Sequence, residues 1–142
     1  MRRLAQDERF AGRAKPAGIL IVEDDYLVSV QAEAALTDAG FEVVGVANSA
    51  EAALELARTG KPDLVVMDIR LAGDRDGVDI AKELFGALGL RSIFATAHNE
   101  EAVRRRAQPA KPLGWLPKPY TMDALCSLVR RSLDAIRNDD RS

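Results

Sequence analysis

Acidic residues follow two short apolar runs that lie far apart in the sequence. Glu23 and Asp24 follow the run Gly18–Val22, and Asp68 follows the run Leu64–Met67. If the two runs form neighbouring parallel strands, three carboxylates converge at one edge of a sheet, where they repel and raise one another's pKa values. A hard divalent cation relieves that repulsion, because Mg²⁺ prefers carboxylate and carbonyl oxygens. The pattern therefore predicts a magnesium site.

A hydroxyl group and an ammonium group follow two later apolar runs. Thr96 ends the run that begins at Ser92, and Lys118 comes shortly after the run Gly114–Leu116. A hydroxyl, an ammonium and Mg²⁺ are what a phosphoryl group on a carboxylate needs around its three oxygens. In this interpretation Asp68 is the nucleophile and forms an acyl phosphate. No general base is required, because the carboxylate is already ionised.

Alternating strand and helix patterns predict the elements that bring these side chains together. The expected strands cover residues 18–22, 41–47, 64–68, 92–96 and 114–116, and helical patterns follow each of them. Five such units with short connections require a parallel sheet with helices on both faces. The prediction is an α/β, flavodoxin-like (βα)5 fold with strand order 2-1-3-4-5. Ligands bind such sheets beyond the strands' carboxyl ends, here between strands one and three.

Polar residues mark where the expected helices begin and end. Asp25 is expected to cap a helix starting at Tyr26, with no contact to metal. Asn48, with Glu51 three residues later, is expected to cap the second helix. The last helix is expected to fade into Asp139 and to pack through one stripe of residues: Met122, Leu125, Val129, Ser132 and Ile136.

The bulk composition favours one compact domain that works inside the cell. Residues 1–17 read as an N-terminal arm, 18–137 as the domain and 138–142 as a C-terminal tail. A net charge of −2 argues against direct binding of nucleic acid. The single cysteine, Cys126, is expected to be inert core in a reducing cytoplasm. No apolar run approaches the roughly 20 residues that span a bilayer, so no membrane contact is expected.

Four segments resemble the signatures of bacterial two-component response-regulator receiver domains, in order and at suitable spacing. They are Val22–Asp25, Met67–Ile69, Ala95–Ala97 and Leu116–Pro119. The resemblance covers roughly residues 17–136. It implies a phosphoacceptor signalling domain of the single-domain type, not an ordinary enzyme, that receives a phosphoryl group on Asp68. The donor would be a histidine kinase or a histidine phosphotransfer protein in a phosphorelay.

The same resemblance implies roles for individual residues. It implies four magnesium ligands: the side chains of Glu23, Asp24 and Asp68 and the backbone carbonyl of Arg70. Thr96 and Lys118 would contact the phosphoryl group, and the Lys118–Pro119 bond would be cis. Phosphorylation is expected to draw Thr96 toward the phosphoryl oxygens. The fourth helix, fifth strand and fifth helix would then repack and bind a downstream protein or a second copy of the chain.

The sequence departs from the receiver pattern at several positions near the site. Ala72 stands where many receivers have proline, and Gly77 lies one residue later than usual. Trp115 replaces the usual tyrosine or phenylalanine of the fifth strand, so the aromatic switch of the family is expected to be altered. Arg70 and His98 occupy positions that tune the phosphoryl lifetime in the family, and we expect the same here.

Other functions stay open at this stage. The chain could be the receiver portion of a longer regulator, or a degenerate receiver that only binds protein. A phosphatase or phosphotransferase with a similar aspartate needs a second acid where Arg70 stands. A flavin-binding module shares this topology, but it needs a Ser/Thr/Gly-rich loop after the first strand to hold phosphate. This chain has acidic residues there, which would repel a phosphate. The triplet Arg104–Arg106 reads as a solvated helix face, and alternatively as part of a docking surface with Trp115 and the last helix.

Overall fold

The computed structural model describes residues 15–71, 75–97 and 101–141, with side chains up to Asp139. Five parallel strands form one sheet, in the expected order β2-β1-β3-β4-β5. The strands are β1 (Gly18–Val22), β2 (Glu42–Ala47), β3 (Leu64–Asp68), β4 (Ser92–Thr96) and β5 (Gly114–Pro117). The fold prediction is therefore confirmed, including the placement of β1 beside β3.

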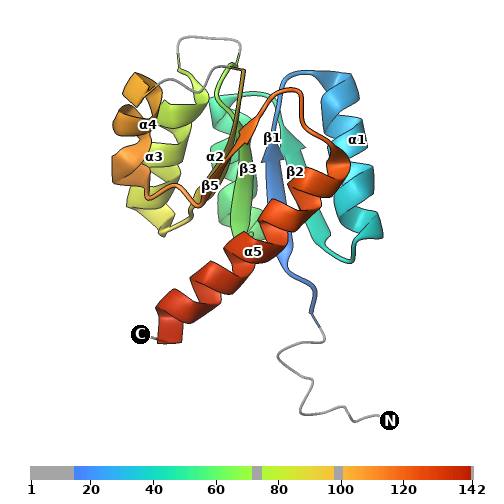
Figure 1. The fold of residues 1–142 in the computed structure, drawn as a ribbon. Coiled ribbons are helices and arrows are strands. Elements are labelled where there is room, and N and C mark those ends of the chain that lie inside the picture. Colours follow the sequence, from blue (N-terminus) through green and yellow to red (C-terminus); the bar gives the residue numbers. More distant parts are fainter. Residues whose placement is uncertain (1–14, 72–74, 98–100, 142) are drawn as a thin grey trace.

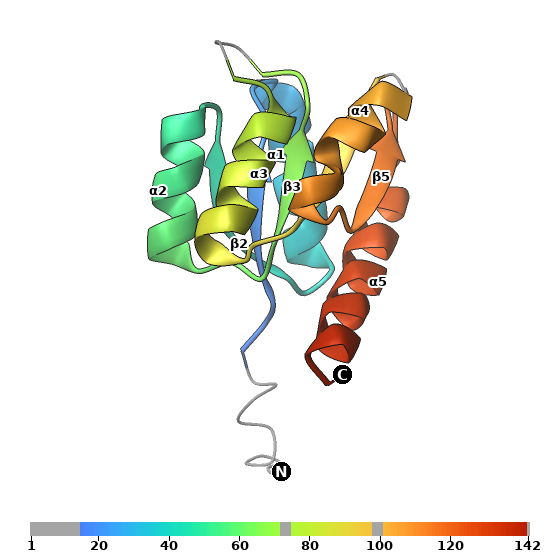
Figure 2. The same cartoon turned by 90° about the vertical axis from the view of Figure 1, so that its left-hand side faces the viewer.

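Helices cover both faces of this sheet (Figures 1 and 2). They are α1 (Tyr26–Asp38), α2 (Ala50–Gly60), α3 (Gly77–Leu88), α4 (Glu101–Ala107), the short 3₁₀ helix η2 (Gln108–Ala110) and α5 (Met122–Arg141). One apolar core lies between the sheet and α1 and α5, and a second lies under α2, α3 and α4. The strands β1, β3 and β4 are buried at every position. That burial on both faces explains why their sequences are continuous apolar runs.

Side-chain caps define where the first two helices begin. The Asp25 carboxylate accepts a hydrogen bond from the Val28 amide at 3.2 Å, as predicted. The predicted cap of the second helix was wrong by one residue. Ser49, not Asn48, caps α2, and its hydroxyl accepts a hydrogen bond from the Ala52 amide at 3.2 Å. The reason is that α2 begins at residue 50, so Ser49 holds the extended backbone directly before the first turn.

The last helix is longer than its sequence pattern indicates. Leu125, Val129 and Ser132 are buried, as the predicted stripe requires. The helix does not fade at Asp139 but continues to Arg141, and its last turns project beyond the sheet (Figure 1). Arg91, just before β4, stabilises that end by donating a hydrogen bond to the Asp139 carboxylate at 3.0 Å. Among the described residues, no helix has both the length and the apolar character that crossing a bilayer demands.

Candidate functional site

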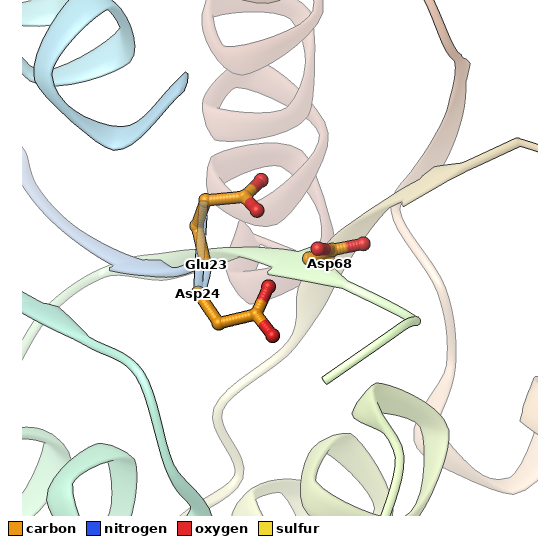
Figure 3. A group of neighbouring side chains, drawn as sticks. All are labelled: Glu23, Asp24 and Asp68. Carbon is orange, nitrogen blue, oxygen red and sulfur yellow. The ribbon is translucent and has the colours of Figure 1, made fainter. Parts of the chain in front are cut away.

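Three carboxylates meet at the carboxyl ends of β1 and β3 (Figure 3). The two strands pair in parallel with Val22 opposite Met67, so the residues that follow them leave the sheet side by side. Carboxylate oxygens of Glu23, Asp24 and Asp68 all lie within 4.8 Å of one another. Glu23 and Asp68 are buried and Asp24 is exposed. The structure thus brings together acidic residues that are 44 positions apart in the sequence.

Lys118 brings a positive charge to this acidic group. Its Nζ lies 3.0 Å from Oδ1 of Asp68 and 4.0 Å from Oε1 of Glu23. The Lys118 backbone is held in place, because its amide donates to the Thr96 carbonyl at 2.8 Å. Its bond to Pro119 is cis, as expected. Thr96 itself is buried at the end of β4. All the side chains that the sequence predicted for the site therefore lie at one edge of the sheet.

Burial shifts the pKa of the central carboxyl group. It raises the pKa of Glu23 from 4.5 to about 7, and a proton shared with Asp68 and the charge of Asp68 act in the same direction. The Asp25 amide, which donates to Glu23 at 3.1 Å, and the Lys118 ammonium only partly oppose this rise. Burial and the same two carboxylates raise the pKa of the neighbouring Tyr120 hydroxyl to about 12. The site therefore carries more negative charge than Lys118 balances.

The donor groups present fit a magnesium ion. Mg²⁺ takes carboxylate oxygens together with several waters, and these carboxylates border an open hollow of about 520 Å³ that water can enter. Arg70 also lines the hollow, and its amide donates to Oδ1 of Asp68 at 3.2 Å. A divalent cation would offset the cost of burying the charge of Glu23 and its repulsion from Asp68, which together raise the pKa of Glu23. The acidic triad is thus a group that could hold a divalent metal ion.

The raised pKa of Glu23 predicts how stability depends on pH without metal. The pKa of Glu23 is about 7 in the folded chain, against 4.5 for a free glutamate. The stability that Glu23 contributes is therefore fully present below pH 4.5 and is lost as the pH rises through 7. Glutamine cannot titrate. Between pH 4.5 and 8, the Glu23→Gln variant should therefore gain about 2–3 kcal/mol of unfolding free energy relative to the parent. Urea unfolding with a chelator measures this gain. If the difference in unfolding free energy between variant and parent were the same at pH 4.5 and at pH 8, the prediction would be refuted.

The three arginines of α4 have different surroundings. Arg104 lies over the Trp115 ring, 4.8 Å from its centroid. Arg106 hydrogen-bonds the Asp76 carboxylate at the start of α3. The interpretation of this triplet as a solvated face holds for Arg105 and Arg106, which are both exposed and make ion pairs at the surface. It does not hold for Arg104, which is half-buried against Trp115.

Sequence reasoning missed one surface beside the site. Tyr26 and Leu27, in the first turn of α1, are 77% and 72% exposed, and Val30 and Val46 continue this apolar patch. The signal was present, because apolar residues in α1 do not follow the spacing of one buried stripe. Two residues discussed above, Ala72 and His98, lie outside the described part of the chain.

Comparisons with known proteins agree with this geometry. The sequence profile of the response regulator receiver domain matches residues 19–130. The chain is 32% identical to the transcriptional regulatory protein PdtaR of Mycobacterium tuberculosis over 127 residues, which is 89% of the chain and 62% of that protein. It is 28% identical to sporulation initiation phosphotransferase F of Bacillus subtilis, over 81% of the chain and 92% of that protein.

Solved structures show the same likeness. The signal receiver domain of a modulated diguanylate cyclase from Desulfovibrio desulfuricans superimposes with a TM-score of 0.80 at 31% identity. That match covers 88% of this chain and 99% of the other. A putative response regulator from Chloroflexus aurantiacus gives a TM-score of 0.75 at 30% identity, over 84% and 99% of the two chains. Both matches extend over most of the described residues.

Proposed function

The chain belongs to the response regulator receiver domain family, and from that premise we propose that it is a phosphorylation switch in which Asp68 accepts a phosphoryl group beside bound Mg²⁺. The observation that supports this most strongly is the acidic group of Glu23, Asp24 and Asp68 with the Lys118 ammonium 3.0 Å from Asp68. The donor would be the phosphohistidine of a histidine kinase or of a histidine phosphotransfer protein.

In the proposed transfer, a carboxylate oxygen of Asp68 forms the new bond to phosphorus while the bond from phosphorus to the donor's imidazole nitrogen breaks. Glu23, Asp24, Asp68 and the backbone carbonyl of Arg70 would hold Mg²⁺, which when bound neutralises negative charge on the acidic side chains and on the phosphoryl oxygens. Lys118 lies close enough to Asp68 to pair with the new phosphoryl group. The Thr96 hydroxyl would donate a hydrogen bond to a phosphoryl oxygen.

We propose residues 18–137 as the receiver unit, with residues 1–17 and 138–142 flanking it. Because receiver domains generally act in the cytoplasm, we propose that location here as well. After phosphorylation, the surface of α4, β5 and α5 would bind a downstream protein or a second copy of the chain. The chain spans 62% of the length of PdtaR, so an output domain on a longer protein is an equally compatible setting for the same chemistry.

Incubation with acetyl phosphate or phosphoramidate tests the proposed function directly. The intact mass should increase by one phosphoryl group with Mg²⁺ and should not increase with a chelator. The fluorescence of Trp115, the single tryptophan of the chain, should change in parallel if the switch reaches β5. Failure to bind Mg²⁺ and failure to gain mass with either donor would favour a degenerate receiver that only binds protein.

The exposed patch on α1 is where we propose that the protein donor docks. Tyr26 and Val30 line a hollow together with Asp24, and Leu27 is exposed in the same first turn of α1. Asp24 also borders the hollow that contains Asp68, so a donor helix seated on this patch would bring its histidine close to Asp68. Apolar side chains with most of their surface in water are typical of such contacts, since their burial supplies binding energy. Carboxylates at Asp24 and Glu33 border the patch and favour a donor with basic residues around its histidine.

Leu27→Glu is expected to slow phosphoryl transfer from a protein donor by about tenfold or more, because it puts a charge into the docked interface. Transfer from acetyl phosphate should stay at the parental rate, since a small donor needs no docking. The probe is any phosphorylated histidine phosphotransfer protein that phosphorylates the parent chain. Leu88→Glu is the matched control, because Leu88 is also exposed but lies at the far end of α3. Equal loss with both kinds of donor would contradict the docking proposal.

A further inference from the structure

The Arg106 guanidinium of α4 ties that helix to the first turn of α3. Its Nη1 lies 3.3 Å from Oδ1 of Asp76, and its Nη2 contacts the second oxygen of the same carboxylate. Nη1 also lies 3.4 Å from Oδ1 of Asp79. The two aspartates form a capping box, in which each side chain accepts a hydrogen bond from the other's backbone amide. Arg106 therefore holds the group that starts α3.

The first turn of α3 touches the backbone of the proposed phosphoacceptor. The Gly77 amide, next to Asp76, donates to the Ile69 carbonyl at 2.8 Å. A Cβ atom at Gly77 would lie only 2.1 Å from the Asp68 carbonyl oxygen, so the two backbones are in direct contact. The position of Asp76 thus controls the position of the backbone at Asp68 and at Arg70, whose amide binds the Asp68 side chain.

A second arginine of α4 reaches β5. Arg104, two residues before Arg106, lies over the Trp115 ring. Trp115 in turn stacks on Phe94 of β4, with ring centroids 5.0 Å apart and planes at 24°. One short helix therefore contacts the start of α3 through Arg106 and contacts Trp115 of β5 through Arg104.

Electrostatics supports the ion pair as more than a chance surface contact. Burial alone would raise the pKa of Asp76, but hydrogen bonds from Arg106 and from backbone amides outweigh burial and hold that pKa below its ordinary value. The hydrogen bond to Asp76 raises the pKa of Arg106 in return. Two contacts between a planar guanidinium and one carboxylate also fix the relative orientation of the two groups, which a single contact cannot do.

We propose that Arg106 is a positioning residue for the proposed metal and phosphoacceptor site, acting through Asp76 and Gly77, and that it couples this site to α4 and Trp115. The inference rests on the proposed function only for the identity of the metal. Coupling between two sites is reciprocal. If the Arg106–Asp76 contact holds the backbone of Asp68 and Arg70 in the position that binds the ion, loss of the contact must weaken Mg²⁺ binding. By the same coupling, Mg²⁺ binding must change the position or the stability of α4.

Magnesium titration of the full chain tests this inference, by calorimetry and by Trp115 fluorescence. Arg106→Gln and Asp76→Asn should each raise the Kd for Mg²⁺ about two- to fivefold, the range that a partly exposed ion pair allows. Asparagine is chosen because it caps helices as well as aspartate does and removes only the charge. Arg105→Gln is the control, because it removes the neighbouring charge of the same helix without touching α3, and its Kd should equal the parent's.

The double variant decides between coupling and two unrelated losses. If the two residues act through their contact, Arg106→Gln with Asp76→Asn should raise the Kd no more than either change alone. Arg106→Lys should rescue part of the affinity, because it restores the charge but not the paired geometry. A parental Kd in Arg106→Gln, or fully additive effects, would overturn the inference. Urea unfolding of each variant confirms that the measured chains are folded.

This titration also separates the inference from the proposed function. A parent chain that binds Mg²⁺ but gains no phosphoryl group would contradict the proposed function. The Kd values of the variants for Mg²⁺ would still test the coupling. A parent chain that binds Mg²⁺ and is phosphorylated, with an Arg106→Gln variant of equal Kd, would overturn the coupling alone. A parent chain that binds no Mg²⁺ would overturn both.

Discussion

Asp68→Asn should lose the mass increase of one phosphoryl group that acetyl phosphate and Mg²⁺ produce in the parent chain. The expected loss in rate is at least about a thousandfold, as for removal of other enzymatic nucleophiles. The physical reason is that a neutral amide oxygen is a poor nucleophile, whereas the ionised carboxylate needs no base to attack phosphorus. The change also removes one of three charges that face the proposed ion, so Mg²⁺ affinity should fall with it. Intact-mass spectrometry follows the first effect and calorimetry the second.

Asp63→Asn is the matched control for this variant. Asp63 lies at the opposite end of β3, where its carboxylate accepts a hydrogen bond from the Gly18 amide at 2.7 Å. It belongs to the same strand region as Asp68 but lies away from the acidic group, so this variant should be phosphorylated like the parent. A phosphorylated Asp68→Asn chain would show that the acceptor is another residue.

Gly77→Ala should have the second largest effect. The added methyl group would lie 2.1 Å from the Asp68 carbonyl oxygen and 2.8 Å from the Ile69 Cα, distances that no real Cβ contact tolerates. Both neighbours are backbone atoms, so relief requires the first turn of α3 to move away from the site. We expect destabilisation by about 1–3 kcal/mol, the usual range for overpacking, together with weaker Mg²⁺ binding. Urea unfolding and a Mg²⁺ titration measure the two effects.

The same helix supplies the control. Gly86 also lies in α3, but a Cβ atom there has no heavy atom within 4 Å. Gly86→Ala should therefore stabilise the chain by about 0.5–1 kcal/mol, because alanine loses less backbone entropy on forming a helix. Mg²⁺ binding should not change. If both variants stabilised the fold equally, the close approach of Gly77 to Asp68 would have no energetic meaning.

The acidic group could be predicted from sequence because three general features locate it. Continuous apolar runs identify the buried strands, alternation with helices makes them parallel, and parallel strands end at a common edge. Any polar residue directly after such a run must then lie at that edge. With strand one next to strand three, this argument predicts Glu23 and Asp24 beside Asp68, and in the structure carboxylate oxygens of the three residues lie within 4.8 Å of one another.

The remaining features depend on contacts that no local pattern encodes. Arg106 and Asp76 are 30 residues apart, and either charge alone reads as a solvated side chain. Asn48 and Ser49 are both good capping residues, so the choice between them depended on the register at which α2 packs. The apolar patch at Tyr26 and Leu27 is different, because the spacing of apolar residues in α1 already indicates that some of them face water.

Locating the phosphoryl group on the parent chain tests the central claim most directly. The chain is incubated with acetyl phosphate and Mg²⁺, and the product is reduced with borohydride, which converts an aspartyl phosphate to homoserine. The reduced chain is then cut with trypsin. Cleavage after Arg58 and Arg70 releases residues 59–70, which contain both Asp63 and Asp68. The account predicts homoserine at residue 68 in this peptide and none when Mg²⁺ is chelated. Modification at residue 63 or in another peptide, or modification that is independent of Mg²⁺, would contradict it.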